Sequence, residues 1–182
     1  MDALKTAVDV LLRPGSAFAA IRGNDCRYFP RALGVASIAY GLSILGTLPH
    51  TISGSKLLLT GAAMGLLAGI VYLVVIYYLG KAWGGNRHWR KVFSVILYMG
   101  VTAIALVAVT VSEAYLAQFH TVVSEASGII RLALLVWFVM ITIEAIKVVN
   151  GFGTWKAIAV GLVAAAASLA AFAPYIAITG II

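Results

Sequence analysis

Glu144 is the acidic residue whose position most suggests chemistry, because it falls inside an apolar stretch near residues 132–149. An acid at the centre of a membrane span costs about 2.5–3.5 kcal/mol on insertion scales, so such residues usually have a partner or a function. Lys147 follows three residues later on the same helical face. Two interpretations are open: a paired or snorkelling acid at a helix end, or a carboxylate that handles protons or substrate inside a helical bundle.

A basic segment at residues 80–91, GKAWGGNRHWRK, could bind anionic groups, and we call it the basic loop. It combines four cations with two tryptophans: Lys81, Arg87, Arg90, Lys91, Trp83 and Trp89. Tryptophan rings favour the headgroup level of a bilayer, and each basic residue near an anionic surface contributes about 1 kcal/mol of attraction. The basic loop therefore predicts contact with anionic lipid headgroups at a membrane surface.

Residue types that form catalytic or metal sites do not converge in the sequence. The spacing of His50, His88, His120, Glu113 and Glu125 does not fit a set of metal ligands. The motifs of serine hydrolases, P-loop proteins, zinc proteases and dinucleotide-binding proteins do not occur. A single cysteine excludes an intramolecular disulfide. We therefore expect no catalytic residue, no metal, no cofactor and no enzymatic activity.

The elements that must position these residues are expected to be membrane-spanning helices. Hydrophobic residues make up 63% of the 182 residues and charged residues 10%, against about 25% charged in soluble domains. Five apolar segments can span a ~30 Å hydrocarbon core, the first and fourth least comfortably; they lie at residues 32–48, 57–79, 92–112, 132–149 and 157–178. We predict an all-α polytopic integral membrane protein with a five-helix transmembrane domain at residues 32–182.

The preceding segment, residues 1–31, is predicted to contain an amphipathic helix. Residues 2–13 place apolar side chains at helical spacing, namely Leu4, Ala7, Val8, Leu11 and Leu12. Pro14 and Gly15 end this helix, and a second short turn carries Phe18 and Ile21. The segment either lies on the lipid surface or folds against the loops of the bundle, and its several arginines favour the lipid surface.

The distribution of basic residues predicts the orientation of the chain. Eleven of the 13 Lys and Arg residues fall in the N-terminal segment, the basic loop and the region around the connection of the last two spans. The positive-inside rule then places the N-terminus in the cytoplasm and the C-terminus outside, in what we expect to be a prokaryotic cell (inner) membrane. The net charge of +7 does not indicate nucleic-acid binding, because the charges sit in short loops.

Three glycines in the second apolar segment, Gly61, Gly65 and Gly69, fall four residues apart and line one helical face. In lipid, small residues allow two helix backbones to approach closely. This face could be the seam of a homodimer. It could also pack against a helix of the same chain, for which the alanine-rich stretch at residues 164–171 is the obvious partner.

The order of these features resembles the Yip-one domain family, in its prokaryotic form. Pro14, Phe18 and Ile21 precede the apolar spans as they do at the start of such proteins. The passage GKAWGGNRHWRKVFSVILYMG is similar to the family's glycine-containing loop with its basic-aromatic stretch and a tyrosine, here Tyr98, in the next span. The passage IEAIKVVNGFGTWKAIAV is similar to the connection of the fourth and fifth spans.

This resemblance covers nearly the whole chain, with two departures. The family often has a proline shortly after the tyrosine, and its eukaryotic members have an aspartate-leucine-tyrosine-glycine-proline motif; neither occurs here. The resemblance implies a multi-span helical fold. Eukaryotic members are implicated in vesicle traffic, with Rab-type GTPases and one another as partners, but their long N-terminal region is reduced here to about 31 residues.

Together these features predict a non-catalytic membrane scaffold or adaptor. Its expected partners are the lipid bilayer, anionic lipids, other membrane proteins or a second copy of the chain, and not nucleic acid. The alternative is a transporter or translocase of small molecules or lipids that uses Glu144 as an intramembrane polar site, for which the sequence lacks an obvious inverted repeat.

Overall fold

The computed structural model describes residues 3–23, 25–47, 55–102, 104, 108 and 121–179. The helices along these residues are α1 (Ala3–Leu12), α2 (Pro14–Gly23), α3 (Asp25–Thr47), α4 (Ser55–Ala82), α5 (Trp89–Tyr98), α7 (Thr121–Asn150) and α8 (Thr154–Thr179). The described part of the chain contains no strand, which confirms an all-α protein for these residues.

Three of the described helices are long and apolar enough to cross a membrane. Their spans are Thr60–Ala82 in α4, Gly128–Asn150 in α7 and Thr154–Pro174 in α8, with mean hydropathies between 2.0 and 2.3. At most 22% of the most apolar part of each span is buried inside the molecule, so apolar side chains cover its outside, as a bilayer requires. The second, fourth and fifth predicted segments are thereby confirmed as candidate membrane spans.

The first and third predicted spans do not meet the same criteria within the described residues. α3 has 23 residues, but it begins with Asp25 and carries Pro30 and Arg31 near its start. α5 ends at Tyr98, and most of the predicted span 92–112 beyond Thr102 lies outside the described part of the chain. The number of five spans therefore stays a prediction.

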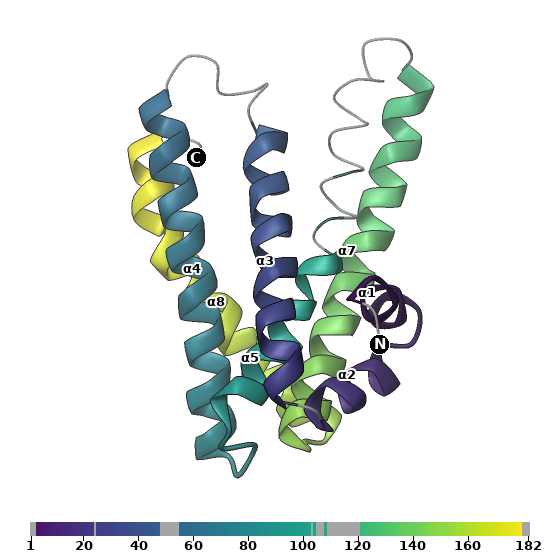
Figure 1. The fold of residues 1–182 in the computed structure, drawn as a ribbon. Helices are drawn as coiled ribbons and strands as arrows, with labels where there is room; N and C mark the ends of the chain where they lie inside the picture. The colour runs from purple at the N-terminus through teal and green to yellow at the C-terminus, as the bar shows by residue number, and fades with distance from the viewer. Residues whose placement is uncertain are drawn as a thin grey trace.

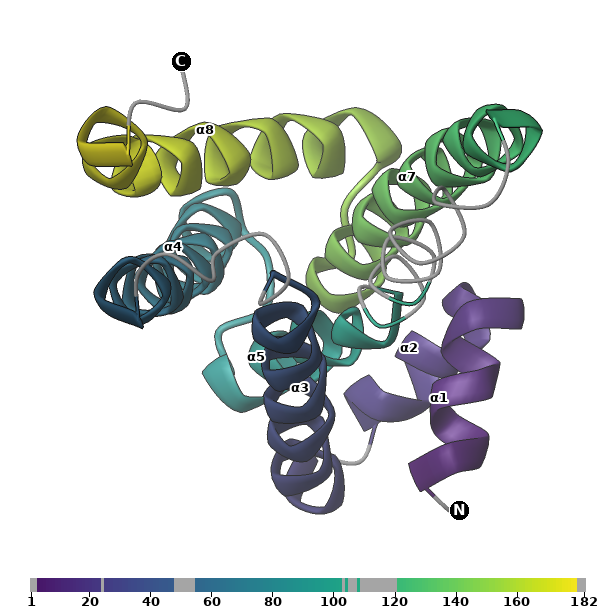
Figure 2. The same ribbon diagram turned by 90° about the horizontal axis from the view of Figure 1, so that it is seen from above.

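The segments that carry most of the basic residues gather at one end of the molecule. The adjoining ends of α2 and α3, the basic loop between α4 and α5, and the connection from α7 to α8 all lie at the lower end in Figure 1. We call this the basic end. α5 contacts α2, α3, α4 and α7 and lies near the middle of the helices when they are seen from above (Figure 2).

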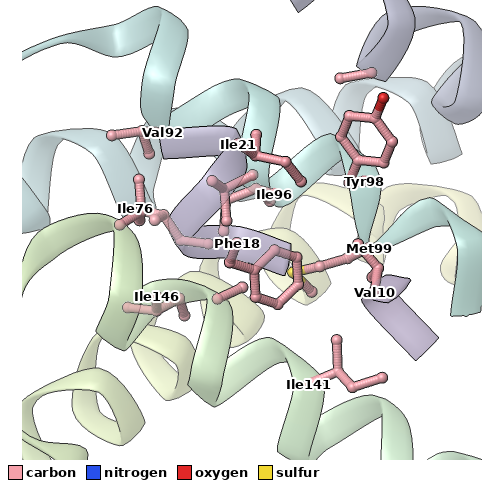
Figure 3. Packing of buried hydrophobic residues seen from close by; sticks show 14 of the residues in the cluster. Val10, Phe18, Ile21, Ile76, Val92, Ile96, Tyr98, Met99, Ile141 and Ile146 are labelled. Atoms are coloured by element: carbon pink, nitrogen blue, oxygen red, sulfur yellow. The ribbon is translucent and has the colours of Figure 1, made fainter. Parts of the chain in front are cut away.

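α2 packs inside the bundle through the apolar residues that the sequence had placed in a short turn. Phe18 and Ile21 are fully buried, and Figure 3 shows Phe18 among side chains that include Ile96 of α5, Met99 directly after α5 and Ile146 of α7. The expected turn is a ten-residue helix that begins at Pro14, a residue common at the first helical position. For α2, the structure favours a helix folded against the bundle over one lying on lipid.

α1 packs on α2, but it buries only part of the apolar face that the sequence pattern outlined, because Ala7 and Leu11 are half-buried against the core. Thr6 and Val10 are buried, whereas Val8 and Leu12 from the predicted apolar face are 44% and 72% exposed. The position of α2 decides which side of α1 is covered, and helical periodicity contains no information about that neighbour. The exposed pair gives α1 an apolar edge, and its contact with lipid stays a prediction.

Candidate functional site

Two helices end at the basic end with the same glycine-based backbone motif. In α4, Gly84 has a φ of +85°, and the N–H groups of Gly84 and Gly85 donate to the carbonyls of Lys81 (3.3 Å) and Gly80 (2.7 Å). This is the Schellman motif, in which a left-handed residue satisfies the last helical carbonyls. In α7, Gly151 has a φ of +70° and the Phe152 N–H donates to the Lys147 carbonyl at 3.0 Å.

Asn150, the last residue of α7, holds the basic loop in place. Its side-chain Oδ1 accepts a hydrogen bond from the Asn86 N–H at 3.3 Å, and its Nδ2 donates to the Ile146 carbonyl at 3.1 Å. The residue is buried, with 7% of its surface exposed. A Cβ at Gly80 or Gly85 would lie only 2.6 Å from the Asn150 Oδ1, so both positions require glycine for this contact.

The rest of the basic loop is fixed by local hydrogen bonds. The Asn86 Oδ1 accepts from the His88 N–H at 2.9 Å, a turn that asparagine side chains commonly form. The Tyr77 hydroxyl of α4 donates to the Arg87 carbonyl at 3.2 Å. This ordered backbone presents the residues predicted to meet lipid: Lys81, Arg87, Arg90, Trp83 and Trp89 are exposed and Lys91 is half-buried.

An aromatic cluster of Phe29, Tyr77, Trp89 and Phe93 joins α3, α4 and α5 beside the basic loop. The Trp89 ring lies 5.3 Å from Phe29 and 5.7 Å from Phe93, and Phe93 lies 6.3 Å from Tyr77, all in edge-to-face geometry. The guanidinium of Arg90 lies 5.4 Å from the Trp89 ring centroid, a cation–π arrangement. Trp89 is thus anchored by packing while 43% of it stays exposed.

Glu144 and Lys147 form the ion pair that their spacing suggested. The Lys147 Nζ lies 3.1 Å from the Glu144 Oε2, and about a third of each side chain is exposed, 31% for Glu144 and 40% for Lys147. The other carboxylate oxygen packs against the first turn of α2, because a Cβ at Gly15 would lie 3.2 Å from it. A helix N-terminus favours a negative charge. This geometry favours the paired acid over an isolated intramembrane carboxylate.

The start and the end of α2 both contact the last turns of α7. While Glu144 meets the first turn of α2, the Arg22 Nη1 near its end donates to the Val148 carbonyl at 2.9 Å. A cation on the last carbonyls of a helix satisfies acceptors and complements the helix dipole. The N-terminal segment is therefore connected to the same helix end that holds the basic loop.

The neighbours of Gly65 and Gly69 on the glycine face of α4 do not include α8 among the described residues, and the partner of this face stays a prediction. α4 and α8 are extensively packed, but through Ala68, whose carbonyl accepts from the Ser168 hydroxyl at 2.9 Å. Gly65 faces Tyr40 of α3, since a Cβ there would lie 3.8 Å from the Tyr40 ring, and at Gly69 a Cβ would meet no described atom within 4 Å. Gly61 is half-buried.

Gly65 and Gly69 instead border a cleft of about 540 Å³ between α3 and α4. α5 and Phe138 of α7 complete its lining. α3 and α4 are not among the extensively packed helix pairs of the described chain, which leaves this space between them.

Asn150, which organises the basic loop, was not identified as a functional residue from the sequence. An Asn-Gly pair at a helix end signals a cap, but no local pattern indicates a contact with Asn86, 64 residues away. Among the described residues, no three His, Cys, Asp or Glu side chains lie together as metal ligands would. His50, Glu113 and His120 lie outside the described residues.

The sequence was compared with known protein families, curated proteins and solved structures. The model of the Yip1 domain matches residues 8–174, from within α1 to Pro174 in α8. No curated protein matches the chain, and no solved structure does.

Proposed function

The chain belongs to the Yip1 domain family, and on this premise we propose that it is a non-catalytic membrane scaffold whose basic end binds anionic lipid headgroups and partner membrane proteins. The observation that carries this proposal is the ordered basic loop, in which the buried Asn150 amide fixes the backbone while Lys81, Arg87 and Arg90 remain exposed.

An ordered loop favours binding, because the cost of ordering it on contact with the membrane is already met in the free protein. Four cations near an anionic surface contribute roughly 4 kcal/mol in total, at about 1 kcal/mol each. Trp83 and Trp89, each 43% exposed, add rings that favour the headgroup level. The basic loop thus suits a surface of anionic lipid better than a soluble ligand.

The shared location of the basic segments supports the proposed orientation. The adjoining ends of α2 and α3, the basic loop and the α7–α8 connection lie at one end in Figure 1, while the described end of α8 points to the other. With the positive-inside rule, this arrangement favours a cytoplasmic basic end and a C-terminus outside, in a cell membrane.

A competition between two lipids tests the proposal. The detergent-solubilised protein is mixed with equal amounts of phosphatidylglycerol and phosphatidylcholine, and the lipids that co-purify are quantified by mass spectrometry. Replacing Arg87 and Arg90 by Gln should reduce the preference for phosphatidylglycerol about 30-fold, which corresponds to about 2 kcal/mol. A control variant removes the same charge from exposed Lys5 of α1 and from exposed Arg13, which follows α1, and should have a smaller effect. An unchanged preference in the loop variant would exclude the proposed lipid contact.

The alternative, a transporter or translocase that uses Glu144, has less support from the geometry. Glu144 is paired with Lys147, and it is not among the described residues that line the cleft. A working intramembrane acid is expected to face a polar cavity or water-filled path. The scaffold is therefore the function that we propose.

A further inference from the structure

The cleft between α3 and α4 is apolar and open toward the outside of the helices. Leu33 of α3 and Leu66 and Ile70 of α4 form its rim, and they are 45%, 53% and 49% exposed. The hydroxyl of Tyr40, which could have made the lining polar, donates to the Ala62 carbonyl instead. The lining of the cleft therefore suits a hydrocarbon chain and provides few hydrogen-bonding groups for a polar solute.

The aromatic cluster lies about one helical turn beyond the end of this cleft that is nearer the basic end. Leu33, Leu73 and Leu97 line the cleft, and each lies four residues, or about one helical turn, from a member of the cluster on its own helix. These members are Phe29 on α3, Tyr77 on α4 and Phe93 on α5. In all three helices the aromatic residue is the one nearer the basic end, so the cleft begins directly above the cluster.

The dimensions of the cleft suit a small apolar ligand. From Leu33 to Gly41 on α3, and from Leu73 to Gly65 on α4, the cleft extends for eight residues, or about 12 Å. The volume of about 540 Å³ falls within the ~300–1,000 Å³ of typical small-molecule sites.

We infer that this cleft binds one acyl chain of an anionic phospholipid whose headgroup lies on the basic loop. The inference rests on the proposed function and adds to it a site for the hydrocarbon part of the same lipid. A length of about 12 Å approaches half of the ~30 Å hydrocarbon core, so the cleft suits a chain from the leaflet that contacts the basic end.

The cations of the basic loop, beyond the aromatic cluster, favour an anionic lipid. Arg90 lies over Trp89, the member of the aromatic cluster that belongs to the basic loop, and Arg87 and Lys81 are exposed on the same loop. A phosphate at this level would meet several cations while its acyl chain enters the cleft from the side. A lipid held at both ends of one site binds more tightly than one held by charge alone.

Gly69 provides a variant that fills the cleft without disturbing the packed core. A Cβ at this position meets no described atom within 4 Å, so Gly69→Phe can extend into the cleft. Gly34→Phe is the matched control, because Gly34 has equally open surroundings among the described residues and is not among those that line the cleft. Gly69→Leu is a smaller second variant, and elution as a single species in detergent verifies that each variant folds.

The experiment uses phosphatidylglycerol with a photoactivatable diazirine midway along one acyl chain. The probe is added in trace amounts to phosphatidylcholine bilayers containing the full-length protein, and labelled peptides are mapped by mass spectrometry. Labelling should concentrate on residues 33–41 and 65–73 over the outward residues of α7. Gly69→Phe should lower it at least about tenfold through lost apolar contact, Gly34→Phe should leave it unchanged, and unlabelled phosphatidylglycerol should compete better than phosphatidylcholine.

Three results would overturn the inference. Equal labelling in Gly69→Phe and Gly34→Phe would show that the chain does not lie in the cleft. Equal competition by the two lipids would show that its headgroup need not be anionic. Cross-links between protein copies at residues 33–41 would show that a second copy occupies the cleft. None of these depends on the lipid preference of the Arg87 and Arg90 variant, which tests the proposed function separately.

Discussion

The basic end and the cleft both depend on glycine, but glycine has opposite effects on packing in the two regions. At the basic end, Gly80 and Gly85 leave room for the Asn150 side chain, whose hydrogen bonds fix the loop. In the cleft, Gly65 and Gly69 border space that none of the described helices closes. Small residues therefore allow close approach without causing it, and a polar partner such as Asn150 determines where packing becomes tight.

The largest difference is expected from one substitution made in both regions. In Gly85→Ala, the new Cβ would lie 2.6 Å from the Asn150 Oδ1 and 2.7 Å from the Gly80 carbonyl oxygen, so the loop must shift. We expect a loss of about 3 kcal/mol in the free energy of unfolding. In Gly69→Ala the Cβ meets open space, and the better helix propensity should stabilise the protein by about 0.5–1 kcal/mol.

Unfolding in detergent, followed by tryptophan fluorescence, measures both variants under the same conditions. Effects of the same sign and size at the two positions would contradict the contrast between a packed basic end and an open cleft.

A somewhat smaller effect is expected for Asn150→Ala. The substitution removes the acceptor of the Asn86 N–H and should cost about 2 kcal/mol, because a partly buried donor loses its partner. The basic loop should then become mobile, and trypsin should cleave after Lys81 and Arg87 faster than in the unmodified protein. Ser168→Ala is a suitable control, since it removes one hydrogen bond far from the loop and should cost only about 0.6 kcal/mol. Unchanged cleavage in Asn150→Ala would mean that the loop is held by other contacts.

The smallest effect is expected for Glu144→Gln. Its ion pair with Lys147 is about one-third exposed, and such pairs contribute about 0.2–1 kcal/mol. The variant should unfold within about 1 kcal/mol of the original and retain the same lipids, because Glu144 lies outside the cleft and the basic loop. Loss of lipid retention in a folded Glu144→Gln protein would instead support a working carboxylate in the bundle.

The all-α class and three of the membrane spans could be predicted from the sequence. A long apolar segment that crosses a membrane must satisfy its own backbone hydrogen bonds, and an α-helix does so within one segment. The pairing of helices could not be predicted from the same information. The spacing of Gly65 and Gly69 indicates that another helix backbone or an acyl chain can approach this face of α4. It does not identify which of the two does so. The burial of Phe18 similarly depends on α5 and α7, which are distant in the sequence.

The site shows the same division between local and distant information. The charges and tryptophans of the basic loop follow from composition, and the Glu144–Lys147 pair follows from helical spacing. The contact of Asn150 with the loop requires a tertiary arrangement that brings the ends of α4 and α7 together. The cleft likewise exists because α3 and α4 each pack mainly on other helices, a feature that no single segment contains.

Native mass spectrometry under lipid-preserving conditions tests the central claim most directly, because it counts protein subunits and retained lipids in the same particle. The account predicts one tightly retained phosphatidylglycerol for each chain, lost both when Arg87 and Arg90 are replaced by Gln and in Gly69→Phe, and kept in Gly34→Phe. Retention of phosphatidylcholine and phosphatidylglycerol to the same extent, unaffected by the loop and cleft variants, would contradict it.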